Sequence, residues 1–95
     1  MAKLLKGKIL HILSASRAVT ARHNLKFLIE HTLNASAFNT LNHKIDSDNY
    51  IPRAVLQEWF VSWESFQGKN ATLKNLAKVL QEMDCNLEAG KYTNE

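Results

Sequence analysis

The sequence has few of the residues that form disulfides, break helices or make tight turns: its 95 residues include one cysteine, one proline and three glycines. Because Cys85 has no second cysteine to pair with, a fold held by internal disulfides is excluded, and a reducing, cytoplasmic compartment is predicted. Long apolar runs are missing as well. No stretch approaches the roughly 18 apolar residues of a membrane-spanning helix, and the N-terminal residues lack the apolar length of a signal peptide.

Catalytic and metal-binding patterns are also missing. The four histidines, His11, His23, His31 and His43, are separated by 12, 8 and 12 positions, so no two of them have the spacing of paired metal ligands on a helix. Cys85 has no base partner nearby in the sequence and is expected to be a packing residue. The three scattered glycines form no phosphate-binding loop. We therefore expect a protein without enzymatic activity, metal or cofactor.

The sequence does contain apolar residues at helical spacing, most clearly in a helical hairpin that begins at Ile51. Pro52 suits the first turn of a helix, where its missing N–H is not needed, and Gly68 suits the position just after the end. Asn70 can cap a second helix, which the short connection makes a close neighbour. The residues expected to face inward are Val55, Leu56, Trp59, Phe60, Trp63, Phe66, Leu73, Leu76, Ala77, Leu80 and Met83.

Three further helices are predicted before this hairpin, over residues 3–13, 20–33 and 37–44, with Thr20 and Ser36 as caps of the second and third. The segment between the first two helices either extends the first helix or forms a loop. Residues 45–49 are expected to be a turn, in which Ser47, Asp48 or Asn49 can cap the hairpin. A short last helix is predicted to begin near Leu87, and residues 91–95 are expected to be a frayed tail. The chain is therefore predicted to be a single all-α domain, an antiparallel six-helix bundle with a short sixth helix and a core at residues 3–90.

Charge is distributed unevenly along the chain although the net charge is only +3. Residues 1–31 hold six lysines and arginines against one acidic residue, whereas residues 32–68 hold two against four. This asymmetry predicts complementary surfaces on one small domain. Glu58 and Glu64 beside the two tryptophans would repel phosphate, which favours core packing over base stacking for these rings.

Residues in the second half of the chain resemble the death-domain family. Trp63, followed after six residues by Asn70-Ala71-Thr72-Leu73, and the ending Asn86-Leu87-x-Ala89 are similar to the last third of that fold. Phe38-Asn39-Thr40-Leu41 and residues 24–33 resemble its third and second helices. The resemblance covers about residues 3–90, is most specific in the C-terminal third, and points to an invertebrate adaptor of the family.

Two residues depart from the family pattern: Trp59 is an additional tryptophan, and Gly90 stands where the sixth helix should continue. The resemblance implies a Greek-key bundle without enzymatic activity that binds another death domain, such as that of the immune-deficiency adaptor or a death receptor, and that can form homo-oligomers. It implies apoptotic or innate immune signalling, in which an initiator caspase is recruited through a death effector domain that this sequence does not contain. No membrane or nucleic-acid partner is expected.

Surface charges are the predicted means of partner binding. One side would be basic and the other acidic, which gives specificity and a fast association rate. The alternative is a small basic helical domain that binds nucleic acid, for which Lys74, Asn75, Lys78 and Gln81 would contact base edges and phosphates. The predicted partner-binding residues are Arg17, Arg22 and Lys26 on the basic side, Asp46, Asp48, Glu58 and Glu64 on the acidic side, and Arg53 nearby.

Overall fold

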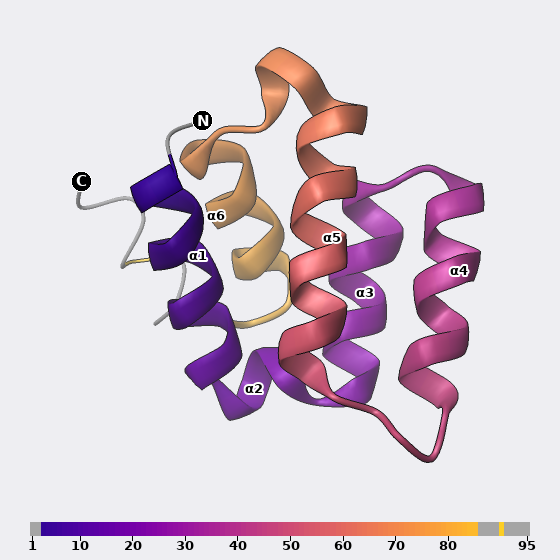
Figure 1. The fold of residues 1–95 in the computed structure, drawn as a ribbon. Helices are drawn as coiled ribbons and strands as arrows, with labels where there is room; N and C mark the ends of the chain where they lie inside the picture. Colours follow the sequence, from indigo (N-terminus) through magenta and orange to yellow (C-terminus); the bar gives the residue numbers. More distant parts are fainter. Residues whose placement is uncertain (1–2, 86–89, 91–95) are drawn as a thin grey trace.

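Six α-helices form the bundle seen in the computed structural model, which describes residues 3–85 and residue 90 (Figure 1). No strand occurs in these ranges, so the predicted all-α six-helix bundle is confirmed. The predicted helix near Leu87 and the predicted tail lie outside the described residues. The helices are α1 (Lys3–Ala15), α2 (Arg17–Thr20), α3 (Arg22–Thr32), α4 (Ala35–Asp46), α5 (Pro52–Gln67) and α6 (Leu73–Glu82), with the 3₁₀ helix η1 (Gly68–Asn70) between the last two.

The segment between α1 and α3 is a separate short helix. Ser16 begins it, because the Ser16 hydroxyl oxygen accepts a hydrogen bond from the Val19 backbone N–H at 3.2 Å. Thr20 ends α2, and its hydroxyl donates to the Ser16 carbonyl at 2.8 Å. The prediction that Thr20 caps α3 is therefore wrong: Ala21 holds that position and has no side chain that could accept a hydrogen bond.

Helix α4 begins earlier and ends later than predicted. Asn34 is its N-cap, with the side-chain oxygen accepting from the Ala37 N–H at 2.9 Å, so the predicted cap Ser36 is wrong. At the other end the predicted turn over residues 45–49 starts two residues too early, because α4 continues to Asp46 and Ile45 is fully buried. The last turn of α4 therefore extends past residue 44 and holds Ile45 in the core.

Helix α5 starts as predicted at Pro52 but without the predicted side-chain cap. None of Ser47, Asp48 and Asn49 caps it, because the residue at the N-cap position is Ile51. The fixed φ angle of proline suits the first turn of a helix, and its absent N–H removes one of the donors that a cap would have to satisfy.

The connection from α5 to α6 turns at Gly68, whose φ of 53° lies in the left-handed region that favours glycine. This confirms the predicted end of α5. The prediction that Asn70 caps α6 is wrong. Thr72 caps it, because its hydroxyl oxygen accepts from the Asn75 N–H at 3.2 Å, while the Asn70 carbonyl accepts from the Asn75 side-chain amide at 2.8 Å.

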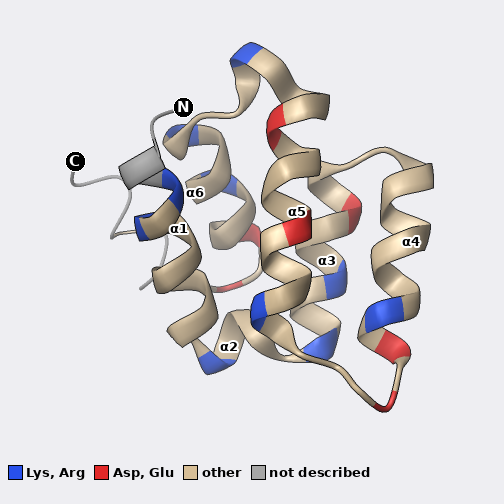
Figure 2. Cartoon of the chain, viewed as in Figure 1, with Lys and Arg blue, Asp and Glu red and all other residues tan. Residues whose placement is uncertain are grey.

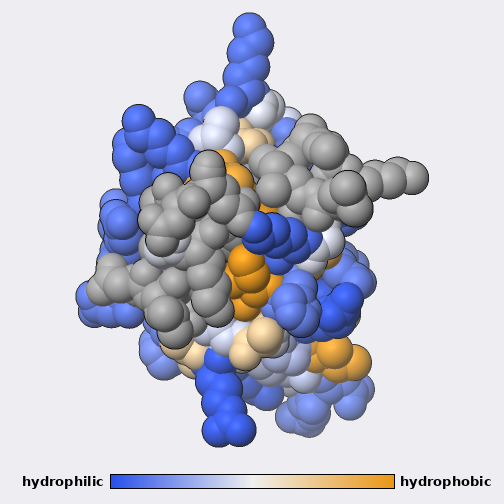
Figure 3. Space-filling view, turned by 90° about the vertical axis from the view of Figure 1, so that its left-hand side faces the viewer, coloured by the Kyte–Doolittle hydropathy of each residue, from blue (hydrophilic) through white to orange (hydrophobic). Residues whose placement is uncertain are grey.

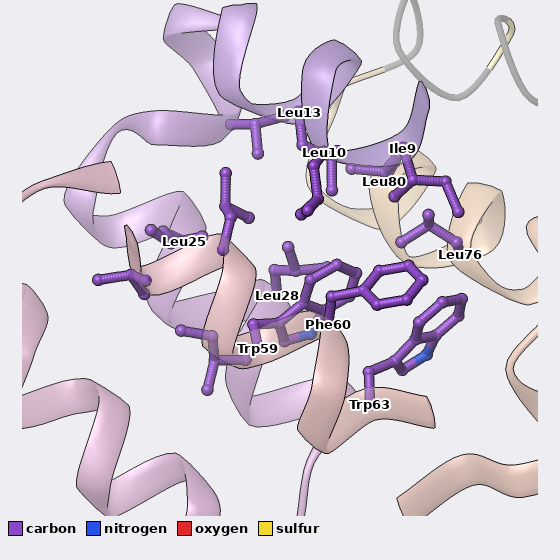
Figure 4. Packing of buried hydrophobic residues seen from close by; sticks show 14 of the residues in the cluster. Ile9, Leu10, Leu13, Leu25, Leu28, Trp59, Phe60, Trp63, Leu76 and Leu80 are labelled. Carbon is purple, nitrogen blue, oxygen red and sulfur yellow. The ribbon is translucent and has the colours of Figure 1, made fainter. Parts of the chain in front are cut away.

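The core is built around α5, which contacts α1, α3 and α4, while α6 packs against α3 (Figures 1 and 4). Trp59 and Trp63 are buried and stacked, with ring centroids 5.2 Å apart. The Trp59 indole N–H donates to the Thr32 hydroxyl at 2.7 Å, and that hydroxyl donates to the Leu28 carbonyl at 2.6 Å. The buried hydrophobic residues are Ile9, Leu10, Leu13, Val19, Leu25, Leu28, Ile29, Leu33, Leu41, Ile45, Val55, Leu56, Trp59, Phe60, Trp63, Leu76, Ala77, Leu80, Met83 and Cys85.

Most residues expected to face inward on the hairpin are buried, but Phe66 is not. Its side chain is 52% exposed. Helical spacing gives the direction in which a side chain points, but not whether a neighbouring helix is present at that height. In the last turn of α5, Phe66 borders a hollow that also touches Asn34 and Ala37, which leaves one side of its ring open. On the face shown in Figure 3, by contrast, hydrophilic side chains cover most of the described surface.

Candidate interaction surface

Six of the eight predicted partner-binding residues gather at one end of the bundle. They lie at the start of α2, in the first turns of α3 and α5, at the end of α4 and in the α4–α5 connection, where Figure 2 shows blue and red segments close together. All six are exposed or half-exposed. We call this region the charged end, and it consists of Arg17, Arg22, Lys26, Asp46, Asp48 and Arg53.

Glu58 and Glu64 lie farther along α5. Glu58 is more than a turn beyond Arg53, and Glu64 is six residues beyond Glu58, which corresponds to about 9 Å along a helix axis. The structure therefore does not bring Glu64 to the charged end.

Opposite charges meet within the charged end. Lys26 Nζ lies 2.6 Å from the Asp46 carboxylate, so the predicted basic and acidic sides touch at this point. Both side chains are partly solvated, and such a surface pair contributes only about 0–1 kcal/mol. Among the described residues Arg17, Asp48 and Arg53 form no ion pair. These three charges are the ones that can meet a partner without first losing an internal contact.

Lys44 also belongs to this surface, although the sequence did not predict it as a partner-binding residue. It holds the Glu58 carboxylate at 2.5 Å across the boundary between α4 and α5. The two residues are fourteen positions apart. No local spacing rule connects residues so far apart, and their contact depends on how the two helices pack.

Tyr50 fastens the α4–α5 connection to the junction between α2 and α3. Its hydroxyl donates to the Thr20 carbonyl at 2.7 Å, and the Arg22 guanidinium lies 4.9 Å from the centre of its ring. Burial raises the pKa of Tyr50, and the positive charge of Arg22 partly opposes that shift. The contact spans thirty positions of sequence, which explains why no local pattern revealed it.

Replacing Tyr50 with phenylalanine should lower the free energy of unfolding by about 0.5–1.5 kcal/mol near neutral pH, because one hydrogen bond is lost while the ring stays over Arg22. The raised pKa means that the folded state favours the protonated phenol. Its contribution is complete below the unfolded pKa of about 10 and disappears as the pH rises through the folded pKa. In urea titrations the difference between wild type and variant should shrink above pH ~10; equal stability near neutral pH would contradict the proposed contact.

The histidines and the cysteine do not form a site. All four histidines are exposed, and His31 stacks on Phe27 with ring centroids 3.8 Å apart. Cys85 is buried among core residues, which confirms its predicted packing role. Within residues 3–85 and residue 90, no three His, Cys, Asp or Glu side chains gather as metal ligands would. None of the helices described is long and apolar enough to cross a membrane.

The residues required by the nucleic-acid alternative lie on α6. Lys74, Lys78 and Gln81 are exposed, but Asn75 is not free, because its side-chain amide donates to the Asn70 carbonyl. An asparagine amide that reads adenine needs both its donor and its acceptor. The arrangement leaves two lysines that can contact phosphates and only Gln81 for base edges, which weakens this alternative.

Comparison with known proteins adds no assignment. The chain matches no protein-family model, no curated protein and no solved structure. The resemblance to death domains therefore depends on sequence features such as Trp63 and the segment Asn70-Ala71-Thr72-Leu73.

Proposed function

We propose that this chain is a non-enzymatic adaptor module of death-domain type that binds another death domain through its charged end. The helical hairpin supports this proposal: Trp63 is buried near the end of α5, next to a short connection that leads into a capped α6. This is the arrangement that the resemblance implies for the last third of the family. The proposed setting is the cytoplasm, in apoptotic or innate immune signalling that leads to recruitment of an initiator caspase.

The observation that carries the proposal is that exposed charges of both signs share one end of a small bundle. Arg17, Asp48 and Arg53 are all exposed at this end, and no ion pair within the described residues neutralises them. Such charges steer encounter and suppress wrong partners more than they add affinity. Because basic and acidic residues occupy different parts of this surface, the basic part of one copy can also meet the acidic part of another head to tail, which allows homo-oligomers.

A binding titration with a purified death domain of the immune-deficiency adaptor or of a death receptor tests this function. Affinity should fall as salt rises, because exposed charges are screened beyond about 8 Å at physiological ionic strength. Arg17→Glu should weaken binding about tenfold at low salt, mostly through slower association. Lys69→Glu is the matched control, since it makes the same charge change beyond the far end of α5, about 24 Å along the helix axis from the charged end.

Two results would reject the proposal. One is binding that responds to neither salt nor Arg17→Glu. The other is an absence of binding to every death domain tested while a random DNA duplex binds, which would favour the nucleic-acid alternative.

A further inference from the structure

A second surface feature lies along α5 and consists of exposed hydrophobic side chains and the hollows that they border. In the described part of the chain three large hydrophobic side chains are more than half exposed: Ile51 at 61%, Val61 at 58% and Phe66 at 52%. All three belong to α5 or to the residue that precedes it. Val61 and Phe66 point about 140° apart around α5, so they border its outer side from two directions. Scattered exposed hydrophobic residues are ordinary, but those that border a hollow indicate a surface that a partner can cover.

These side chains border three hollows that adjoin one another. The largest, of about 770 Å³, lies between α1, α4 and α5. It shares Ala37 and Val61 with the hollow beside Phe66, and Ala54 with the hollow beside Ile51. The first two form one outer groove, whose lining includes Leu10, Ala37, Leu41, Ala54, Val61 and Ser62. The Lys44–Glu58 ion pair bridges α4 and α5 at the third hollow, beside Ile51.

Small side chains explain why the groove is open. Ala37 on α4 and Ala54, Ser62 and Ser65 on α5 line it, and none of them can fill the space between the two helices. Along α5 the groove extends from Ala54 to Phe66 in the last helical turn. At 1.5 Å per residue this is about 18 Å, a little over three helical turns.

The charges on the groove leave one cation unmatched. Lys44 and Glu58 neutralise each other at the end of the groove nearest Ile51. Lys6 lines the groove from α1, lies 5.5 Å from the centre of the Phe60 ring and pairs with no carboxylate of the described residues. An occupant that is apolar toward the groove and acidic along one edge would complement this lining.

We propose that the outer groove binds an amphipathic α-helix of a partner protein, with its apolar face against Val61 and Leu41 and an acidic side chain beside Lys6. A groove among three helices, about three turns long, suits a helix, and no strand edge is present in the ranges described that an extended peptide could join. This surface is separate from the charged end. The inference stands whether or not a death domain binds there.

A display library of helical peptides provides the test, selected on the wild-type chain and counter-selected on Val61→Glu. Selected peptides should carry large apolar residues at helical spacing and acidic residues on one flank. They should bind Val61→Glu and the groove-filling variant Ser62→Trp at least tenfold more weakly, and Lys69→Glu normally. Selection on Lys6→Glu should instead enrich basic flanks. Val61 is mostly exposed and Ser62 only half-buried, so melting of each variant should show that it remains folded.

Several outcomes overturn the proposal. Peptides that bind wild type and Val61→Glu equally, or a selection that yields no amphipathic pattern, would show that the groove is not a helix site. The same flank preference on wild type and Lys6→Glu would remove the role of Lys6. Sedimentation that shows a wild-type dimer dissociated by Val61→Glu would assign the groove to a second copy of this chain instead.

Discussion

Trp63→Ala is expected to lower the free energy of unfolding by about 3–5 kcal/mol, the range for deleting a large aromatic side chain from a core. Trp63 is 2% exposed, stacks on Trp59 and meets Phe60 edge-on with ring centroids 5.5 Å apart. Alanine would remove both aromatic contacts and leave a cavity that rigid neighbouring helices cannot close completely. Because small domains are stable by only about 5–15 kcal/mol, the variant is expected to unfold at low denaturant or not to fold at all.

Phe66→Ala is the matched control for this experiment, since it deletes another aromatic ring from the same helix, three residues away. Phe66 is half exposed, so its removal should cost well under 2 kcal/mol. Urea unfolding followed by circular dichroism measures both variants. Equal effects of the two substitutions, or an unchanged midpoint for Trp63→Ala, would contradict the core described here.

Thr32→Val should cost about 1–3 kcal/mol, although it preserves the shape of the side chain. The Thr32 hydroxyl is buried, accepts from the Trp59 indole N–H and donates to the Leu28 carbonyl. Valine would leave the indole N–H without an acceptor in a site that water does not reach. The substitution therefore adds the cost of a buried, unpaired N–H group to the loss of one hydrogen bond.

Thr40→Val is the control for this substitution. Thr40 is exposed, and its hydroxyl donates to a carbonyl one turn back in the same helix, so water can replace that contact and the cost should stay below about 0.5 kcal/mol. A double-mutant cycle with Trp59→Phe isolates the shared hydrogen bond. If Thr32→Val costs as much in the Trp59→Phe background as in wild type, the two side chains are not coupled.

The helices of this fold could be predicted from the sequence because apolar spacing is a local property. The inward positions of Trp59 and Trp63, the start of α5 at Pro52 and its end at Gly68 all follow from rules that act within a few residues. The caps were harder to assign, because neighbouring polar residues compete for the same role. Asn34 and Thr72 are the caps, and each lies two residues from the one predicted.

The surface could be predicted less well because it depends on which helices are neighbours. Charge counts along the chain indicated the residues of the charged end, but not that Lys26 and Asp46 would pair. The groove could not be predicted, because Val61 belongs to no apolar stripe and Phe66 was predicted to be buried although its side chain is exposed. The ion pair requires the packing of α3 against α4, and the groove requires that of α4 against α5, which no single helix specifies.

One measurement addresses the central claim, that this bundle binds a death domain with its charged end. Backbone amide NMR shifts of the ¹⁵N-labelled chain would be recorded during titration with a death domain. We expect the perturbed amides to cluster around Arg17, Asp48 and Arg53 and to lose their response at high salt. Perturbations centred on Lys74 and Lys78 that appear only with duplex DNA, and none with a death domain, would contradict the claim.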